Sequence, residues 1–331
     1  MENKQRIFFR ADAGVQIGYG HFIRTLALAD MLKEDFECIF FTQSPTIYQL
    51  EEVAKVCPLV ALPSDDTRFD LFLGYLSGNE IVVLDNYFFT SDYQFKIKAK
   101  GCKLVCIDDM HDKHYYADLV INQGLGYSQS DYSCEKYTRF AFGLKYSLLR
   151  KPFLEASNSL KYRTDFKGSK VLVAFGGSDF LNLTSKVINK IVNIDTITDI
   201  IAIVGDSYNI ENEVKNKKVT YKKNLSARNL VQLFQSVDCA ILPASTMLNE
   251  ALACGTSIIG GYYIDNQEHD YYMFLQEGLI IGVGDYTDIQ AMDRVIYGLS
   301  RIIRHRDLTI TSEVAIRYID LFKSLQNENI C

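Results

Sequence analysis

Short apolar runs that end in polar or glycine-rich segments recur along the chain, and they predict an α/β protein. Continuous apolar runs such as Ile81–Leu84 are typical of strands buried on both faces of a parallel sheet. Apolar residues three and four apart, such as Phe22, Leu26 and Ala29, predict helices between the strands. The predicted strands are 7–9, 38–41, 58–62, 81–84, 103–107, 118–123, 170–175, 200–206, 238–242 and 257–260. The predicted helices are 22–32, 49–56, 70–76, 183–191, 229–237, 247–254, 288–303 and 312–325.

The pattern falls into two halves. Pro152 and the polar stretch up to Lys170 suit a connection between domains. A chain of 331 residues is also long for a single core. We therefore expect one Rossmann-like domain over 1–150 and a second over 168–305, followed by a C-terminal segment over 306–331.

The first predicted strand leads into a glycine-rich turn that contains a histidine. Gly18 and Gly20 allow backbone to approach a ligand closely, and the unpaired N–H groups of the following helix favour an anion. His21 can accept a proton near neutral pH, and Asp12 in the same loop is the candidate to orient it. A tight turn without ligand, and a histidine that only caps or packs, are the alternatives.

Polar residues follow two further strands of the first half. Asp85 and Tyr87 lie beyond one strand, at the edge where open α/β sheets bind ligands, although Asp85 could equally cap the next helix. Asp108 and Asp109 end another strand, and we expect capping and loop hydrogen bonds for Asp109.

Several of these segments together carry a family resemblance. The chain resembles the hydrolases that remove UDP from UDP-2,4-diacetamido-2,4,6-trideoxy-β-L-altropyranose in pseudaminic acid biosynthesis, the PseG/SpsG type. The matching segments are Arg10-Ala11-Asp12-Ala13, Gly18-x-Gly20-His21, Arg24, Asp85-x-Tyr87, Ile107-Asp108-Asp109, Ala117–Gln123 and Gly143-x-x-Tyr146-x-Leu148-Leu149-Arg150. Thr25 stands where the family usually has cysteine.

The resemblance implies a fold. The predicted strand over 170–175 is followed by Gly176, Gly177 and Ser178, so each half has a strand that ends in a glycine-rich loop. Together with the resemblance, this predicts the GT-B-like α/β fold, in which two Rossmann-like domains face one cleft. The last helix is then expected to pack back on the N-terminal domain.

The resemblance also assigns substrate-binding residues. Ser245 and Thr246 open a helix; they are ordinary cap residues and could equally cradle a pyrophosphate. The resemblance implies that the Glu250 carboxylate, one turn later, accepts hydrogen bonds from the ribose hydroxyls. The alternative is that Glu250 is a solvated surface residue. The neighbouring amides of Asn266 and Gln267 stand at the family position for contacts to the sugar. The expected binding set is completed by residues at the two glycine-rich strand exits: Arg10, Gly18, Gly20, Arg24, Gly176, Gly177 and Ser178.

The reaction expected from this set is hydrolysis of a UDP-sugar. His21 deprotonates a water that attacks the anomeric carbon with inversion, Asp12 orients His21, and Tyr87 and Asn266 position sugar or water. No metal or cofactor is expected. A GT-B glycosyltransferase that uses a UDP-sugar donor, and a sugar-nucleotide-binding protein without catalysis, are the alternatives.

Composition narrows the partners. Hydrophobic residues make up 48% and charged residues 23%, with a net charge of −6 and scattered basic residues, which disfavours nucleic-acid binding. No apolar run approaches the roughly 20 residues of a membrane span, and the N-terminus lacks a signal-peptide core, so we expect a cytoplasmic monomer. The eight dispersed cysteines are expected to be reduced and structural, with a metal pair at Cys102 and Cys106 as the alternative.

Overall fold

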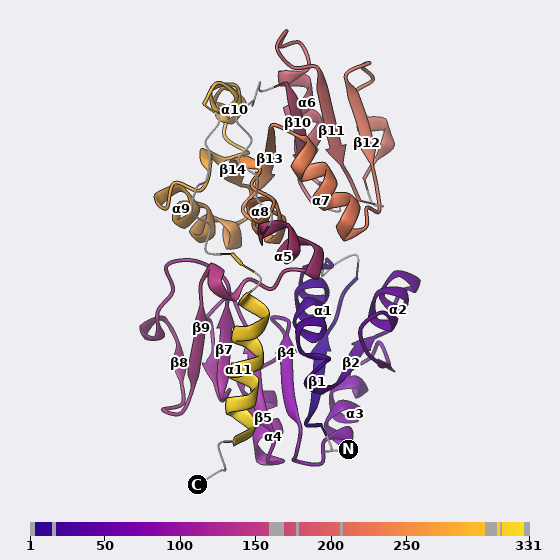
Figure 1. Ribbon diagram of the computed structural model, residues 1–331, viewed down its shortest axis with the longest axis vertical. Coiled ribbons are helices and arrows are strands. Elements are labelled where there is room, and N and C mark those ends of the chain that lie inside the picture. Colours follow the sequence, from indigo (N-terminus) through magenta and orange to yellow (C-terminus); the bar gives the residue numbers. More distant parts are fainter. Residues whose placement is uncertain are drawn as a thin grey trace. The chain divides into compact units, whose positions relative to one another are not determined.

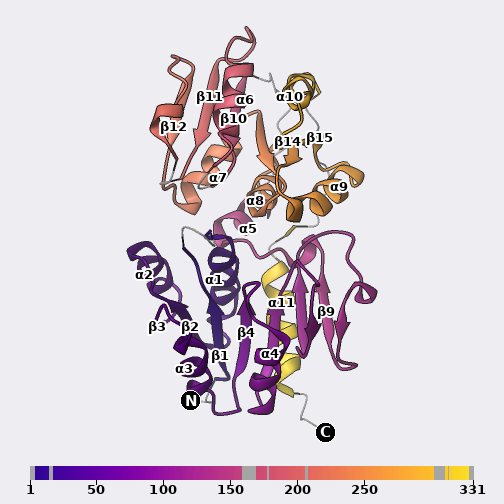
Figure 2. The ribbon, with the colours of Figure 1, turned by 180° about the vertical axis from the view of Figure 1, so that it is seen from behind.

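The computed structural model describes residues 4–14, 18–158, 169–176, 179–205, 208–301, 310–311 and 313–327. The chain divides into two compact units, one of Met1–Lys151 with Ser312–Cys331 and one of Pro152–Thr311 (Figures 1 and 2). Each unit is built on a parallel sheet with helices on its faces. The α/β class predicted from the pattern of apolar runs is confirmed.

The first unit contains a seven-stranded parallel sheet with the order β3-β2-β1-β4-β5-β7-β9. From one edge to the other, these strands are β3 (Leu59–Leu62), β2 (Glu37–Gln43), β1 (Arg6–Ala11), β4 (Ile81–Asp85), β5 (Lys103–Ile107), β7 (Leu119–Asn122) and β9 (Arg139–Phe142). The chain adds β2 and β3 on one side of β1 and the later strands on the other. The carboxyl ends of β1 and β4 therefore form a topological switch point, where doubly wound sheets bind ligands.

Helices cover both faces of this sheet. Alternate residues of a strand point to opposite faces, and Phe40 of β2 contacts Phe22 of α1 (Gly20–Leu32), whereas Phe41 contacts Phe72 of α3 (Thr67–Tyr75). Ile97 of α4 (Ser91–Ala99) belongs to the same buried cluster as Phe41 and Phe72. The remaining elements of this part of the chain are α2 (Ile47–Ala54) and a small parallel pair, β6 (His114–Tyr115) with β8 (Ser133–Cys134).

The last helix, α11 (Glu313–Asn327), packs in the first unit beside α1 (Figure 1). Phe322 lies against Phe36, with ring centroids 6.2 Å apart, and Tyr318 donates a hydrogen bond to the carbonyl of Tyr146. Arg139 of β9 donates to the Ser324 hydroxyl at 3.0 Å. The chain thus leaves the first unit near Lys151 and returns to it for its final helix.

The second unit repeats the topology with the order β12-β11-β10-β13-β14-β15. These strands are β12 (Val219–Lys222), β11 (Asp199–Ile203), β10 (Lys170–Ala174), β13 (Cys239–Pro243), β14 (Ser257–Tyr262) and β15 (Ile281–Asp285). Its helices are α5 (Lys151–Asn158), α6 (Leu183–Ile191), α7 (Ala227–Ser236), α8 (Thr246–Ala253), α9 (Glu268–Gln276) and α10 (Ala291–Leu299). A second switch point therefore lies at the carboxyl ends of β10 and β13.

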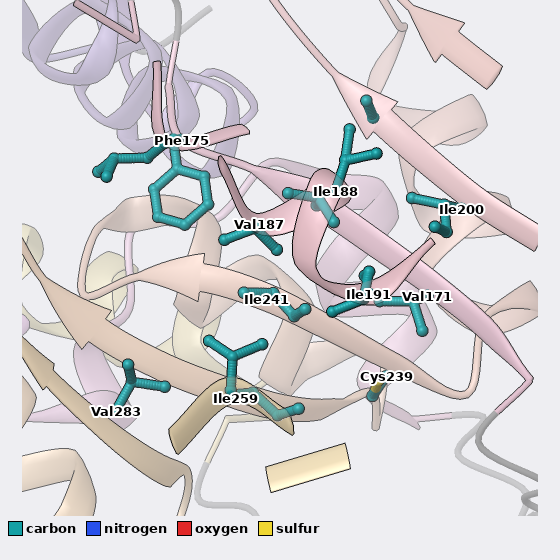
Figure 3. Packing of buried hydrophobic residues seen from close by; sticks show 14 of the residues in the cluster. Val171, Phe175, Val187, Ile188, Ile191, Ile200, Cys239, Ile241, Ile259 and Val283 are labelled. Carbon is teal, nitrogen blue, oxygen red and sulfur yellow. The ribbon is translucent and has the colours of Figure 1, made fainter. Parts of the chain in front are cut away.

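One buried core of the second unit lies on the sheet face covered by α6 and α10. Figure 3 shows its strand residues packed with Val187, Ile188 and Ile191 of α6. Val187 of α6 and Val295 of α10 pack there with strand residues such as Val283. On the opposite face, α9 lies so close to β15 that a side chain on Gly282 would meet the Tyr271 hydroxyl at 2.6 Å. The two faces of this sheet are both buried, which explains the continuous apolar runs in the sequence.

Candidate active site

The loop after β1 lies at the switch point of the first sheet. Gly18 has a positive φ of 78°, and its N–H donates to the Gly14 carbonyl at 2.7 Å, so the described ends of the loop meet. Helix α1 then begins at Gly20. Among the described residues, no side chain caps this N-terminus and no acidic residue lies in its first turn. The first N–H groups of α1 therefore remain available to an anion.

His21, in the first turn of α1, is paired with the aspartate at the end of β4. Its Nδ1 lies 2.7 Å from Oδ1 of Asp85, which is fully buried. Because a carboxylate only accepts hydrogen bonds, the neutral imidazole that fits this contact carries its hydrogen on Nδ1 and its lone pair on Nε2. The Tyr87 ring meets the imidazole edge to face, with centroids 4.6 Å apart. This geometry prepares Nε2 of His21 to accept a proton.

Asp85 receives three further hydrogen bonds. Arg24 donates from Nε and Nη2, both at 2.7 Å, and the Thr25 hydroxyl donates at 2.8 Å. Burial alone raises the pKa of Asp85, but the charges of Arg24 and His21 and the hydrogen bonds from these two residues together hold that pKa well below its usual range. Asp85 is therefore ionised at neutral pH and serves as a fixed acceptor for His21.

Asp12 does not contact His21, and its predicted orienting role is wrong. Its carboxylate accepts from both amino groups of Arg10 and from the backbone N–H of Gln43, while its own N–H donates to Asn86. The reason is the period of the strand, since residues 10 and 12 point to the same side and pair with each other. Arg10 is completely buried in this pair, so its prediction as a substrate contact is also corrected.

Arg24 is likewise held inside the protein. It lies one turn after His21 on the same side of α1, is only 6% exposed and uses Nη1 to bind Asp109 at 2.8 Å. Its guanidinium is thus bound to two carboxylates, and its role as a substrate contact stays a prediction. Asp109, expected only to cap or to bond within its loop, is an ion-pair partner of the site.

The glycine-rich exit of β10 differs from the first loop. Gly176 has a positive φ of 84°, and Gly177 and Ser178 lie outside the described residues. The buried carboxylate of Asp179 accepts from the backbone N–H groups of Leu183 and Thr184 at 2.8 and 2.9 Å. The N-terminus of α6 is therefore already occupied by an acidic cap.

The N-terminus of α8, at the exit of β13, has no such cap among the described residues. Ser245 occupies the N-cap position without a side-chain cap bond, Thr246 follows it, and the first turn contains no acidic residue. Glu250 is only 4% exposed, so the alternative of a solvated surface residue is wrong. Of the two predicted amides, Asn266 is exposed, whereas Gln267 is buried and its Oε1 accepts from the Tyr263 N–H at 3.2 Å.

Within the described part of the chain, no group of three or more His, Cys, Asp or Glu residues is arranged to hold a metal ion. The described cysteines, Cys38, Cys57, Cys102, Cys106, Cys134, Cys239 and Cys254, are all free thiols. His111 and His114 do not share a helix, because His111 has a positive φ and His114 lies in β6. A search of the described helices found none long and apolar enough to span a membrane.

Comparison with known proteins connects the chain to a named group. It is 26% identical over 80% of its length to the UDP-2,4-diacetamido-2,4,6-trideoxy-beta-L-altropyranose hydrolase of Campylobacter jejuni, of which 93% is covered. It is 25% identical over 91% of its length to the spore coat polysaccharide biosynthesis protein SpsG of Bacillus subtilis, of which 90% is covered. The chain is a homologue of PseG and SpsG. An uncharacterized protein of Methanocaldococcus jannaschii is 27% identical over 95% of the chain and 70% of its own length. No family model matches the chain.

Solved structures confirm the predicted fold class. UGT89C1 of Arabidopsis thaliana with UDP-L-rhamnose matches with a TM-score of 0.63 at 10% identity, covering 98% of this chain and 99% of that one. Alr3699/HepE of Anabaena with UDP and glucose matches with a TM-score of 0.56 at 11% identity, covering 97% and 95%. These neighbours are glycosyltransferases of the GT-B fold, and the two Rossmann-like units of this chain have the same architecture.

Proposed function

We propose that this protein is an enzyme that hydrolyses a UDP-linked 2,4-diacetamido-2,4,6-trideoxyhexose, the β-L-altropyranose in the first instance, to UDP and free sugar. The observation that carries the proposal is the buried pair of His21 and Asp85 at the switch point of the first sheet. The homologue that bears the name of this hydrolase supports the substrate. The reaction would serve nonulosonic acid biosynthesis in the cytoplasm.

The proposed chemical step needs only water and the chain's own residues. Nε2 of His21 takes a proton from water as the water oxygen forms a bond to C1 of the sugar. The bond from C1 to the phosphate oxygen breaks, and UDP leaves with the electron pair. The configuration at C1 inverts, and the imidazolium is stabilised by the ionised Asp85 until it releases the proton. Tyr87, whose ring fixes one edge of the imidazole, and Asn266 are proposed to position the water and the sugar.

The proposed leaving-group site lies in the second unit at the start of α8. This helix has an uncapped N-terminus among the described residues, whereas the N-terminus of α6 is filled by Asp179. The negatively charged diphosphate is therefore proposed to bind at the N-terminus of α8, beside Ser245 and Thr246. Glu250 is proposed to accept the ribose hydroxyls. Gly18, Gly20 and Gly176 let backbone approach the substrate, and no metal is required in this scheme.

The GT-B neighbours favour one second candidate, a glycosyltransferase that uses a UDP-sugar donor. Incubation of the purified protein with the diacetamido UDP-sugar and no acceptor separates the two. Free UDP and free sugar in equal amounts, detected by mass spectrometry, support hydrolysis, and release only after an acceptor is added supports transfer. Intact bound nucleotide would instead indicate a binding protein without catalysis.

Two variants make this experiment specific. His21→Gln removes the proposed base and is expected to reduce UDP release at least about 100-fold, the usual range for a general base. His114→Gln is the matched control, because His114 lies in β6 and pairs with Glu135. Near-normal turnover by His21→Gln would refute the proposed mechanism.

A further inference from the structure

Arg24 binds a second carboxylate, that of Asp109, in addition to Asp85, the partner of His21. Arg24 places Nε and Nη2 on Asp85 and Nη1 on Asp109, with all three distances between 2.7 and 2.8 Å. The Asp85 side chain is fully buried, and that of Asp109 is 32% exposed. One guanidinium thus bridges two carboxylates that come from the ends of β4 and from just beyond β5.

A count of charges shows what the second carboxylate does. Arg24 with Asp85 alone would be neutral, and His21 would face an aspartate whose charge is cancelled by a cation at the same distance. With Asp109 included, the cluster of Arg24, Asp85 and Asp109 has a net charge of −1. Protonation of His21 brings that sum to zero instead of creating a net positive charge in a buried place.

We infer that Asp109 is a positioning residue of this site, which binds the free side of Arg24 so that Asp85 keeps its negative charge for His21. Asp109 acts through Arg24 and not by touching the substrate. The inference rests on the proposed role of His21 as the base. It adds a residue whose expected role was only capping.

The Thr25 hydroxyl lowers the negative charge that Asp85 offers to His21, whereas Asp109 preserves it. Its hydroxyl is fully buried and donates to Oδ2 of Asp85 at 2.8 Å, so it withdraws charge from the acceptor that His21 uses. The groups that face the imidazole are therefore Asp85 from β4, Arg24 from α1 and the Tyr87 ring. Asp109 acts on the imidazole through its contact with Arg24, and Thr25 acts through its contact with Asp85. Removing Asp109's charge and removing Thr25's hydroxyl must change the basicity of His21 in opposite directions.

The test uses two isosteric variants and a matched control. Asp109→Asn keeps an oxygen for Arg24 but removes the charge, which makes the imidazolium less favourable. The acid limb of the kcat/KM profile is then expected to move to lower pH by about half a unit, and kcat to fall about 3- to 10-fold. Thr25→Val removes the hydroxyl and is expected to move the limb to higher pH. Asp92→Asn, which breaks an exposed ion pair with Lys96, should move nothing.

A second measurement does not depend on turnover. The His21 ring is followed by NMR over the same pH range in the substrate-free protein, with its signal assigned from His21→Gln. Midpoints that move down in Asp109→Asn and up in Thr25→Val support the inference, even if the wild type hydrolyses no UDP-sugar. Midpoints that do not move, or that move the same way, overturn it. A higher KM for Asp109→Asn with an unchanged His21 titration would show a direct substrate contact and would also overturn it.

Discussion

Replacing Asp85 by asparagine tests the site most directly, because four hydrogen bonds converge on its carboxylate. The donors are His21 Nδ1, Nε and Nη2 of Arg24, and the Thr25 hydroxyl. In Asp85→Asn the amide oxygen at the Oδ2 position can still accept from Nε of Arg24 and from Thr25. The amide nitrogen at the Oδ1 position then faces Nδ1 of His21 and Nη2 of Arg24. A donor at this place forces the imidazole hydrogen to Nε2, which can no longer accept a proton from water.

The expected loss follows from this change of tautomer. The corresponding aspartate-to-asparagine change in hydrolases with a serine, histidine and aspartate triad lowers kcat about 10⁴-fold, so we expect a loss of about 10³- to 10⁴-fold here. That is about 4–5.5 kcal/mol of transition-state stabilisation. Breaking one partner of a buried ion pair also costs about 3 kcal/mol of folding free energy, which lowers Tm by about 6–10 °C.

The assay measures UDP release by the folded fraction, with thermal unfolding followed on the same samples. Asp66→Asn is the control, because Asp66 forms an ion pair with Arg68 on the surface, where such a pair contributes about 0–1 kcal/mol. It should leave both activity and Tm nearly unchanged. A folded Asp85→Asn protein with kcat/KM within threefold of the wild type would refute the assignment of Asp85 as the acceptor that orients His21.

Three further outcomes are expected. Asp12→Asn should lower the free energy of unfolding by about 3 kcal/mol in a denaturant titration, because it breaks the buried pair with Arg10, while kcat per folded molecule stays within threefold. A loss of kcat as large as that of Asp85→Asn would restore the orienting role of Asp12. Glu250→Gln should raise the Kd for UDP about tenfold by calorimetry, and an unchanged Kd would remove Glu250 from the ribose site. The pKa of Asp85 is lowered in the folded state, so its contribution to stability is present above the ordinary carboxyl pKa of about 4 and is lost as pH falls below that value. Below about pH 4, Asp85→Asn should therefore lose less stability per pH unit than the wild type. An equal loss in both proteins would contradict the pairing.

The local pattern of the sequence determined most of the elements and the fold class. The predicted helix over 183–191 coincides with α6, and the predicted strand over 103–107 coincides with β5. Apolar periodicity is a short-range property, so it shows in the sequence wherever both faces of an element are buried. It does not show β15, where Gly282 replaces an apolar residue because α9 leaves no space for a side chain.

The candidate site was predicted only in part. The glycine-rich turn and His21 follow from the sequence, since a strand, a turn and a helix start are neighbours along the chain. The partner of His21 does not follow, because Asp12 is nine residues away in the sequence and Asp85 is 64. Proximity in sequence favoured the wrong aspartate, which the period of the strand turns toward Arg10.

Only the tertiary structure decides which carboxylate meets the imidazole. The sheet order places β4 directly beside β1, and the carboxyl ends of the two strands then bring Asp85 next to the start of α1. The same parallel packing brings Asp109, beyond β5, to the other side of Arg24. Strand pairing of this kind depends on contacts between distant residues, which a local pattern of apolar and polar positions does not contain.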